Sequence, residues 1–137
     1  MDGSRKKRGL ERRKEILGAT FVENSLKNVD EFSKPFQELV NEYVWGVAWD
    51  DPSLDPKYRS ILNLGILAAM GRFQEFETHF RTALRNGLTK KELQAALIHI
   101  GIYCGAPVGV ECFRSAKKVL EETAMAVPPN RTPKKKK

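Results

Sequence analysis

The chain has 137 residues, of which 41% are hydrophobic and 30% are charged, and its formal net charge is +7 at pH 7. This length predicts one domain that buries a core without help from a metal or a disulfide. No apolar run approaches the roughly 20 residues that a membrane-spanning helix needs, and the N-terminus lacks the apolar segment of a secretory signal. We therefore expect a cytoplasmic protein that does not contact a membrane.

The excess of positive charge over negative charge lies near the two ends of the chain, within residues 1–14 and 130–137. A nucleic-acid-binding domain carries its basic residues on a folded face, among aromatic side chains. The pattern therefore favours solvated tails and does not indicate nucleic acid as a partner, although weak polyanion contact or nuclear import is a second interpretation. We expect a basic disordered tail over residues 1–14, a helical domain over 15–127 and a second basic disordered tail over 128–137.

The first half of the chain predicts helices separated by turn signals. Residues 9–32 predict one or two short helices, and Ser33–Pro35 starts a clearer helix because proline suits a first turn. Its expected core stripe consists of Phe36, Leu39, Val40, Tyr43 and Val44. Trp45 and Trp49 follow, and tryptophans four residues apart are most often core anchors; the wall of a ligand pocket is the alternative.

Two helices in the middle of the chain carry the strongest patterns. Residues 54–71 are apolar on nearly every side, so this helix should be central, and Arg59 is one of its few polar positions. Residues 72–86 predict the next helix, which ends at a glycine. Its apolar residues recur at steps of three and four and should face the core. They are Phe73, Phe76, Phe80 and Leu84.

A second stripe on that helix carries Arg72, Glu75 and His79. Steps of three and four place a guanidinium, a carboxylate and an imidazole along one face, near enough to share protons and hydrogen bonds. Glu–His pairs at this spacing are also common on solvated helix faces. Spacing alone therefore leaves both a catalytic and a purely structural role open.

The last third predicts two more helices, one ending at Gly105 and one starting at Pro107. In the first, His99 and Tyr103 lie one turn apart, either as a core pair that satisfies itself or as part of a pocket wall. No β-pattern appears in the sequence. We therefore expect an all-α domain of about six to seven helices.

The inventory of reactive residues excludes several kinds of chemistry. Cys104 and Cys112 form neither a CxxC pair nor half of a zinc site, and we expect two reduced, mostly buried thiols and no bound metal. There is no serine nucleophile elbow and no glycine-rich phosphate loop. Acid–base chemistry by Glu75 and His79 remains. The candidate binding groups are Arg72, Arg59, His99 and Tyr103.

Four stretches give the chain a broad resemblance to a known family. They are PFQELVNEYVWG (35–46), LDPKYRSILNLGILAAMGR (54–72), EFETHFRTALRNGLTKKEL (75–93) and LIHIGIYCGAP (97–107). From about residue 18 to residue 120 the chain resembles the carboxymuconolactone decarboxylase family, within the wider alkylhydroperoxidase D-like group. The resemblance implies an all-helical fold that assembles into trimers or hexamers, with active sites near subunit contacts and no cofactor.

The peroxidase branch of that group carries a CxxCxxxH motif, and only His79 matches it. Arg72 and Glu75 occupy the two cysteine positions, and Ser60 stands where that branch has a glutamate. Thiol peroxidase activity is therefore disfavoured. The E-x-x-x-H arrangement of Glu75 and His79 matches the decarboxylase branch.

The resemblance implies decarboxylation of 4-carboxymuconolactone to β-ketoadipate enol-lactone, in the catabolism of aromatic compounds such as protocatechuate. In this interpretation Glu75 and His79 relay the proton, and Arg72 or Arg59 anchors the acetate arm of a lactone dicarboxylate. The remaining substrate-binding candidates are His99 as a donor to the lactone oxygen, Tyr103 beside it, and Trp45 or Trp49 as an apolar wall. A related small-molecule enzyme and a non-catalytic oligomeric scaffold with the same fold are the alternatives.

Overall fold

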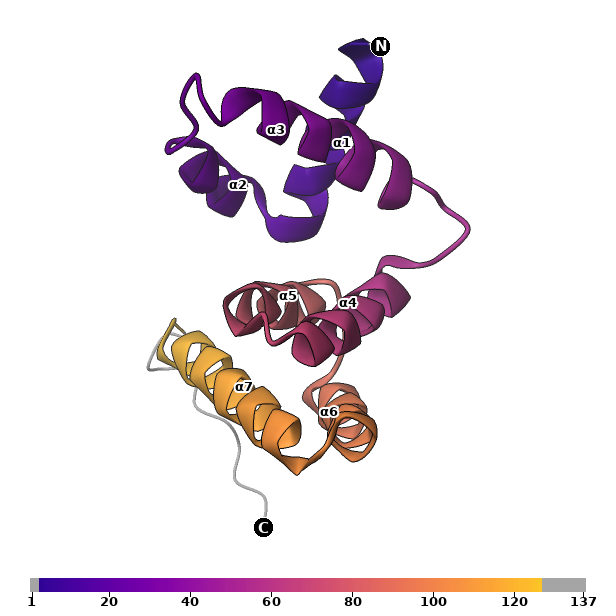
Figure 1. Ribbon diagram of the computed structural model, residues 1–137, viewed down its shortest axis with the longest axis vertical. Coiled ribbons are helices and arrows are strands. Elements are labelled where there is room, and N and C mark those ends of the chain that lie inside the picture. Colours follow the sequence, from indigo (N-terminus) through magenta and orange to yellow (C-terminus); the bar gives the residue numbers. More distant parts are fainter. Residues whose placement is uncertain (1–2, 127–137) are drawn as a thin grey trace. The chain divides into compact units, whose positions relative to one another are not determined.

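The computed structural model describes residues 3–126, which form seven α-helices and one π-helix and contain no strand (Figure 1). In chain order the helices are α1 (Gly3–Leu17), α2 (Ala19–Leu26), α3 (Lys34–Leu39), the π-helix η1 (Val40–Ala48), α4 (Pro56–Met70), α5 (Phe73–Arg85), α6 (Lys90–Cys104) and α7 (Ala106–Ala126). The expected all-α class is thereby confirmed over this range. None of these helices combines the length and the apolar character that a bilayer crossing would require.

The described chain divides into two compact units. Unit 1 contains the described residues up to Leu62 together with Thr82–Thr89. Unit 2 contains Asn63–Arg81 and the described residues from Lys90 onward. Helices α4 and α5 each contribute residues to both units, whereas α6 and α7 belong to unit 2 alone.

Glycines in the left-handed conformation end the two middle helices. Gly71 (φ 74°) follows α4, and Gly87 (φ 103°) follows α5. After α4 the N–H of Arg72 donates to the carbonyl of Leu67 over 2.8 Å, which is the six-residue closure of a Schellman motif. This turn fixes the backbone of Arg72 directly before the first residue of α5.

In unit 1, α1 packs closely against η1 through two glycines. A Cβ added at Gly9 would lie 1.7 Å from the carbonyl oxygen of Asn41, and one added at Gly46 would lie 2.8 Å from the carbonyl oxygen of Arg5. Arg8 pairs with Asp50 over 2.7 Å across the same contact. Residues 3–14 therefore differ from the expected disordered tail, because small residues let this basic helix dock. The tail expected over 128–137 lies outside the described residues.

The core stripe predicted for α3 and η1 is wrong at four of its five positions. Phe36, Leu39, Tyr43 and Val44 are between 42% and 65% exposed, whereas Glu42, Trp45 and Gly46 are buried. Hydrogen bonds in η1 span five residues, as in the bond from the N–H of Trp49 to the carbonyl of Val44. This wider register turns a different face inward from the one that an α-helical period predicts.

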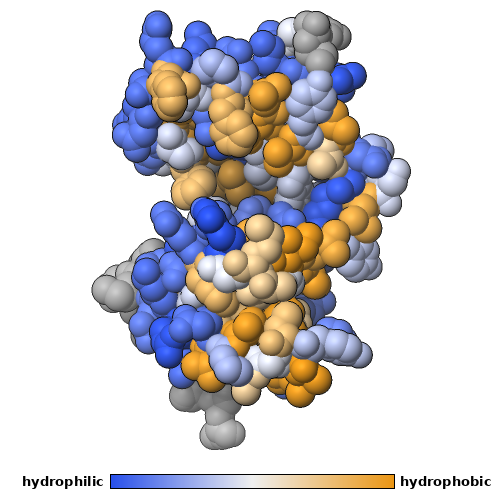
Figure 2. Space-filling model, viewed as in Figure 1, coloured by the Kyte–Doolittle hydropathy of each residue, from blue (hydrophilic) through white to orange (hydrophobic). Residues whose placement is uncertain are grey.

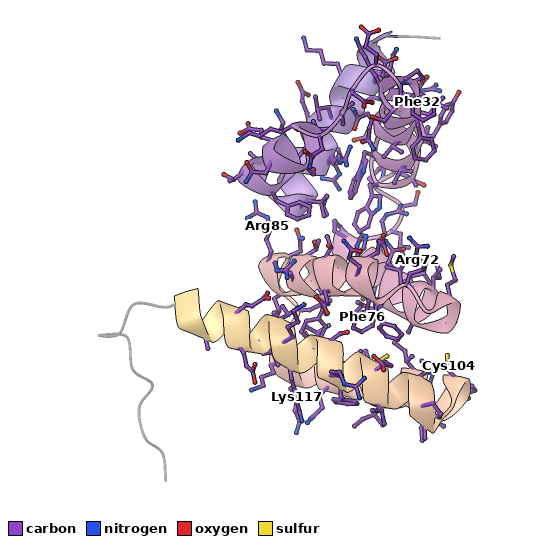
Figure 3. The ribbon with its side chains drawn as sticks, turned by 60° about the vertical axis from the view of Figure 1, so that its left-hand side comes forward. Phe32, Arg72, Phe76, Arg85, Cys104 and Lys117 are labelled. Carbon is purple, nitrogen blue, oxygen red and sulfur yellow. The ribbon has the colours of Figure 1, made fainter. Side chains whose placement is uncertain are left out.

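The core of unit 2 agrees with the prediction for α5. Phe76 and Phe80 are 0% and 2% exposed, their ring centroids lie 6.3 Å apart, and Figure 3 shows Phe76 between α5 and α7. Helices α6 and α7 cross where a Cβ on Gly101 would lie 3.2 Å from the Cα of Gly109. Three helices thus enclose one apolar interior, and glycines permit the close crossing.

Large apolar side chains also reach the surface. On α4 they recur at steps of four, whereas Leu64 and Ala68 of the same helix are buried. The exposed residues of this stripe are Tyr58, Leu62, Ile66 and Met70. The hydrophobic colouring in Figure 2 marks such residues on the face that it shows. Helix α4 is therefore buried along one side and exposed along the other, whereas the sequence pattern predicted a helix surrounded by the core.

Candidate active site

The candidate site is built on the first two turns of α5, within unit 2. Arg72 occupies the residue before the helix, and its carbonyl accepts a 2.9 Å hydrogen bond from the N–H of Phe76. Glu75 lies in the first turn and His79 one turn later. The buried phenylalanines on the neighbouring stripe fix the rotation of the helix, so all three polar residues start from a rigid element.

Arg72 and Glu75 form a two-point ion pair. The Nε of Arg72 donates to Oε1 of Glu75 over 3.3 Å, and Nη2 donates to Oε2 over 3.2 Å. This hydrogen-bonded guanidinium is the main reason why the pKa of Glu75 is lowered from its ordinary value, and the carboxylate raises the pKa of Arg72 in turn. Glu75 is therefore a carboxylate at neutral pH. Arg72 retains N–H groups that could bind an anion.

Helix geometry adds to the stabilisation of the Glu75 anion. The unpaired N–H groups of the first turn place partial positive charge at the start of α5, and the Glu75 carboxylate lies in that turn. The side chain stays half-exposed, so solvent weakens these interactions. An ionised carboxylate is thus held at a fixed place and remains accessible.

His79 differs from Glu75, because its environment favours the neutral form of the side chain. Burial lowers the pKa of its imidazole below the usual value, and the negative charge of Glu75 partly opposes this effect. The imidazole is therefore mainly neutral at pH 7. A neutral imidazole one turn from a carboxylate can accept a proton, and the carboxylate would then stabilise the imidazolium. This pair can take up a proton and deliver it to a bound molecule.

His99 and Tyr103 occupy α6 in the same unit, and they are not a core pair. Both side chains are exposed, Tyr103 to 79%, and their rings lie 4.7 Å apart at a tilt of 35°. The possibility that they satisfy each other in the core is therefore wrong for the described chain. Both rings are therefore accessible to solvent.

Arg59 has a structural environment that the sequence did not reveal. Its Nη2 donates to the carbonyl of Asp51 over 2.9 Å, and its Nε donates to the carbonyl of Leu54 over 3.1 Å. The side chain is only 16% exposed. Arg59 thus fastens the loop before α4 within unit 1, and the anchoring of a substrate is not needed to explain its position.

Trp45 and Trp49 are core residues of unit 1, which agrees with the first of the two predicted roles. Each is 4% exposed, and their ring centroids lie 5.0 Å apart in a stacked arrangement. Ile16 completes the buried cluster. Packing in the core explains both rings, and their suggested substrate contact stays a prediction.

The sequence analysis missed the burial of Glu42. This side chain is 3% exposed, and its Oε2 has no hydrogen-bond partner among the described residues. Nothing in an α-helical pattern signals it, because the π-register of η1 turns it inward. Cys104 also differs from expectation, since it is exposed, whereas Cys112 is buried and burial raises its pKa to about 11.

Known proteins resemble this chain along most of its length. Residues 34–118 match the sequence profile of the Carboxymuconolactone decarboxylase family. The chain is 39% identical over 114 residues to nitrosuccinic acid decarboxylase from Metarhizium robertsii, which covers 83% of this chain and 80% of that protein. It is 35% identical over 125 residues to 4-carboxymuconolactone decarboxylase from Acinetobacter baylyi, and this alignment covers 91% of this chain and 93% of that protein.

These similarities confirm two of the predictions at a general level. Both relatives are decarboxylases, so the chain is a carboxy-lyase, and its substrate is a small molecule. The matching profile spans more than half of the 137 residues, including the whole of α5. The chain therefore belongs to the carboxymuconolactone decarboxylase family.

Proposed function

We propose that this protein decarboxylates 4-carboxymuconolactone to β-ketoadipate enol-lactone, without a cofactor, in the catabolism of aromatic compounds. The observation that carries the proposal is the start of α5, where an ionised Glu75 and a mainly neutral His79 lie one turn apart. The relative from Acinetobacter baylyi, whose name gives the same reaction, supports the choice of substrate. The relation covers most of both chains.

The chemistry of the substrate explains why these few groups would suffice. The bond between the ring carbon and its carboxylate breaks, and the electron pair passes through the ring double bond to the lactone carbonyl. CO₂ leaves, and the ring becomes a dienolate. One proton then adds to the ring carbon next to the lactone carbonyl. The substrate is its own electron sink, so the protein needs only to orient it, stabilise the oxyanion and supply the proton.

His79 and Glu75 are assigned to the proton transfer. A dianionic substrate beside His79 would raise the pKa of the imidazole, so substrate binding would itself favour the uptake of a proton from solvent. The Glu75 carboxylate stabilises the resulting imidazolium, which then donates to the ring carbon. Such a positioned acid contributes typically about 10²–10⁴-fold.

The remaining site residues are assigned to binding. The N–H groups of Arg72 that Glu75 does not use can reach the acetate carboxylate of the substrate, while the ion pair fixes the direction of the guanidinium. His99 and Tyr103 are the candidates for the lactone oxygen. Arg59 is the weakest of the candidates, because backbone carbonyls already use its donors.

A second substrate has its own support, since the relative from Metarhizium robertsii is a nitrosuccinic acid decarboxylase. Nitrosuccinate is also a dicarboxylate, and its nitro group can accept the electron pair that CO₂ leaves behind. The same residues could then protonate the carbon that bears the nitro group. The two proposals share the proton relay and differ in the group that receives the electrons.

We also propose a homo-oligomer, a trimer or a hexamer. The support is the apolar stripe on α4, in which Tyr58 and Met70 are 63% and 65% exposed, and the exposed Ile102 on α6. Burial of such side chains between copies would be favourable, and isolated proteins rarely expose large contiguous apolar patches. Light scattering at micromolar concentration tests this, and a stable, active monomer would contradict it.

The substrate is tested by mixing the purified protein with each lactone or nitro compound. We expect ultraviolet absorbance to fall with 4-carboxymuconolactone, with one CO₂ released for each substrate consumed. Turnover of nitrosuccinate alone would favour the second substrate. A peroxide-reduction assay in parallel tests the disfavoured thiol peroxidase, and inactivity in all three assays would favour a non-catalytic scaffold or a different substrate.

A further inference from the structure

A cavity of about 280 Å³ lies within unit 2, among α5, α6 and α7. Its apolar wall consists of Phe80, Leu97, Phe113, Ala116 and Leu120. Lys90, Gln94 and Lys117 supply its polar groups. The volume equals that of about nine liquid water molecules, which suits a compound of about nine non-hydrogen atoms.

The two lysines at this cavity differ from three other cations of unit 2. Those three are held in ion pairs, namely Arg81–Glu122, Lys118–Glu77 and Arg114–Glu111. Neither Lys90 nor Lys117 pairs with any residue that the structure describes. The cavity therefore combines an apolar interior with two ammonium groups whose charge no described carboxylate balances.

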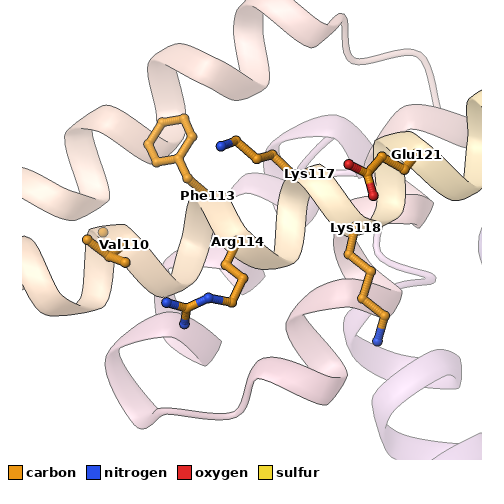
Figure 4. A pocket seen from close by; sticks show the side chains of 7 residues that line it. Val110, Phe113, Arg114, Lys117, Lys118 and Glu121 are labelled. Atoms are coloured by element: carbon orange, nitrogen blue, oxygen red, sulfur yellow. The ribbon is translucent and has the colours of Figure 1, made fainter.

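A neighbouring hollow along α7 differs from this cavity in its lining and in its charges. It is larger, about 690 Å³, but α7 alone provides its lining residues, so no second helix encloses it. Figure 4 shows Arg114 and Lys118 on one side of α7, and Phe113 and Lys117 on the other. The two cations on the first side are already paired with carboxylates. Phe113 and Lys117, on the second side, line the cavity among α5, α6 and α7.

The cavity is separate from the candidate active site. Phe80 lines it, whereas the adjacent His79 leaves α5 in a direction about 100° away, because 3.6 residues make one helical turn. Glu77 of α5 bonds to Lys118 of α7, so α7 covers the side of α5 that carries Phe80. None of Arg72, Glu75 and His79 lines the cavity.

We propose that this cavity is a second, non-catalytic binding site for a small ring carboxylate. The ring would lie against Phe80, Leu97 and Phe113, and the carboxylate would lie at the ammonium groups of Lys90 and Lys117. The Gln94 amide can donate a further hydrogen bond. Ligand sites commonly combine an apolar wall with a few polar groups in this way. The proposal does not depend on which compound the enzyme decarboxylates.

Benzoate is a suitable probe because it has nine non-hydrogen atoms and one carboxylate. We expect calorimetry or ligand-observed NMR to give a Kd on the order of 0.1–1 mM at low salt. Lys90→Gln and Lys117→Gln should each weaken binding about three- to fivefold, and the double variant about tenfold or more. Uncharged benzamide should bind at least about tenfold more weakly than benzoate.

Lys91→Gln is the matched control, because Lys91 is an exposed lysine next to Lys90 that does not line the cavity. It should change benzoate affinity less than about twofold. Equal weakening by Lys91→Gln would show a general charge effect and overturn the proposal. His79→Gln and Arg72→Leu should both retain benzoate binding. Loss of binding in Arg72→Leu, with normal binding in Lys90→Gln and Lys117→Gln, would place benzoate in the active site instead.

A cavity-filling variant tests the apolar wall. Ala116 is 3% exposed and lines the cavity, so Ala116→Leu should occupy the space of the ring and abolish benzoate binding. Circular dichroism and thermal melting would verify that this variant folds. A folded Ala116→Leu protein that binds benzoate normally would contradict the site. If the variant does not fold, the lysine series decides the question alone.

Discussion

Two arginines of the chain have different roles in the two units. Arg59 in unit 1 is 16% exposed and donates hydrogen bonds to two backbone carbonyls. Arg72 in unit 2 is 59% exposed and donates two hydrogen bonds to one carboxylate. Both stood as possible anchors for a substrate carboxylate. The difference teaches that the partners of a basic residue, rather than its position in a motif, decide whether it can bind an anion.

The same contrast extends to the aromatic candidates. Trp45 and Trp49 of unit 1 are buried against Ile16, whereas His99 and Tyr103 of unit 2 are exposed. The candidates in unit 1 are thus explained by packing and by loop fastening. His99 and Tyr103, by contrast, lie on a helix with their side chains open to solvent, so packing does not explain them.

The largest expected effect concerns the pair on α5. Glu75→Gln and His79→Gln should each lower turnover by at least about 10²-fold, because either change removes one member of the proton relay. The double variant should cost little more than the worse single variant, since residues that act as a unit are not additive. Steady-state kinetics measures this, with helix content and oligomer size as checks on folding. Normal turnover in both glutamine variants would move the site to His99 and Tyr103.

The next effect tests the glycine contact that docks α1 on η1. Gly9→Ala should lower the free energy of unfolding by about 1–3 kcal/mol, because its Cβ would overlap a backbone carbonyl that cannot move freely. Gly3→Ala is the control, since no atom lies within 4 Å of its added Cβ. It should change stability by less than about 0.5 kcal/mol. Equal urea denaturation midpoints for the two variants would mean that α1 does not dock in solution.

Local signals explain how much of the fold the sequence predicted. Pro35, Gly71 and Gly87 mark helix boundaries through backbone restrictions that do not depend on the rest of the chain. The apolar period of α5 is regular, and it predicted the buried faces of Phe76 and Phe80 correctly. The boundaries of these helices and the buried face of α5 were therefore accessible from the residues themselves.

Tertiary contacts explain what the sequence did not predict. The π-register of η1 and the burial of Glu42 go together with the docking of α1, which requires a close approach at Gly9. The many basic residues of α1 suggested a solvated tail, although long side chains such as Arg8 can fold over a partner helix and pair there. At the site, the spacing of Glu75 and His79 was visible because one helix carries both. The carbonyl partners of Arg59 come from a loop and were not visible.

Substitutions of Arg59 and Arg72 test directly whether the two residues have different roles. Arg59→Leu should lower the free energy of unfolding by about 1–3 kcal/mol, because two hydrogen bonds from the charged guanidinium to backbone carbonyls are lost, while the KM of the folded protein changes little. Arg72→Leu should raise KM about fivefold with little loss of stability, because its ion pair is solvent-exposed. Arg114→Leu is the matched control, since Arg114 forms a comparable exposed pair with Glu111. A raised KM in Arg59→Leu and an unchanged one in Arg72→Leu would reverse the comparison.

The smallest effect is the pH dependence of stability, which separates the titration of His79 from that of Glu75. The pKa of His79 is lowered in the folded protein, so between that pKa and the ordinary value of 6.5 the unfolded chain binds more protons. Stability should therefore fall as the pH drops through about 6.5, and His79→Gln should remove this part of the dependence. The pKa of Glu75 is also lowered, so its contribution is present above 4.5 and is lost only at lower pH. Thermal melting between pH 5 and pH 8 thus reports mainly on His79, and identical pH profiles for the parent and His79→Gln would show that burial does not hold this imidazole neutral.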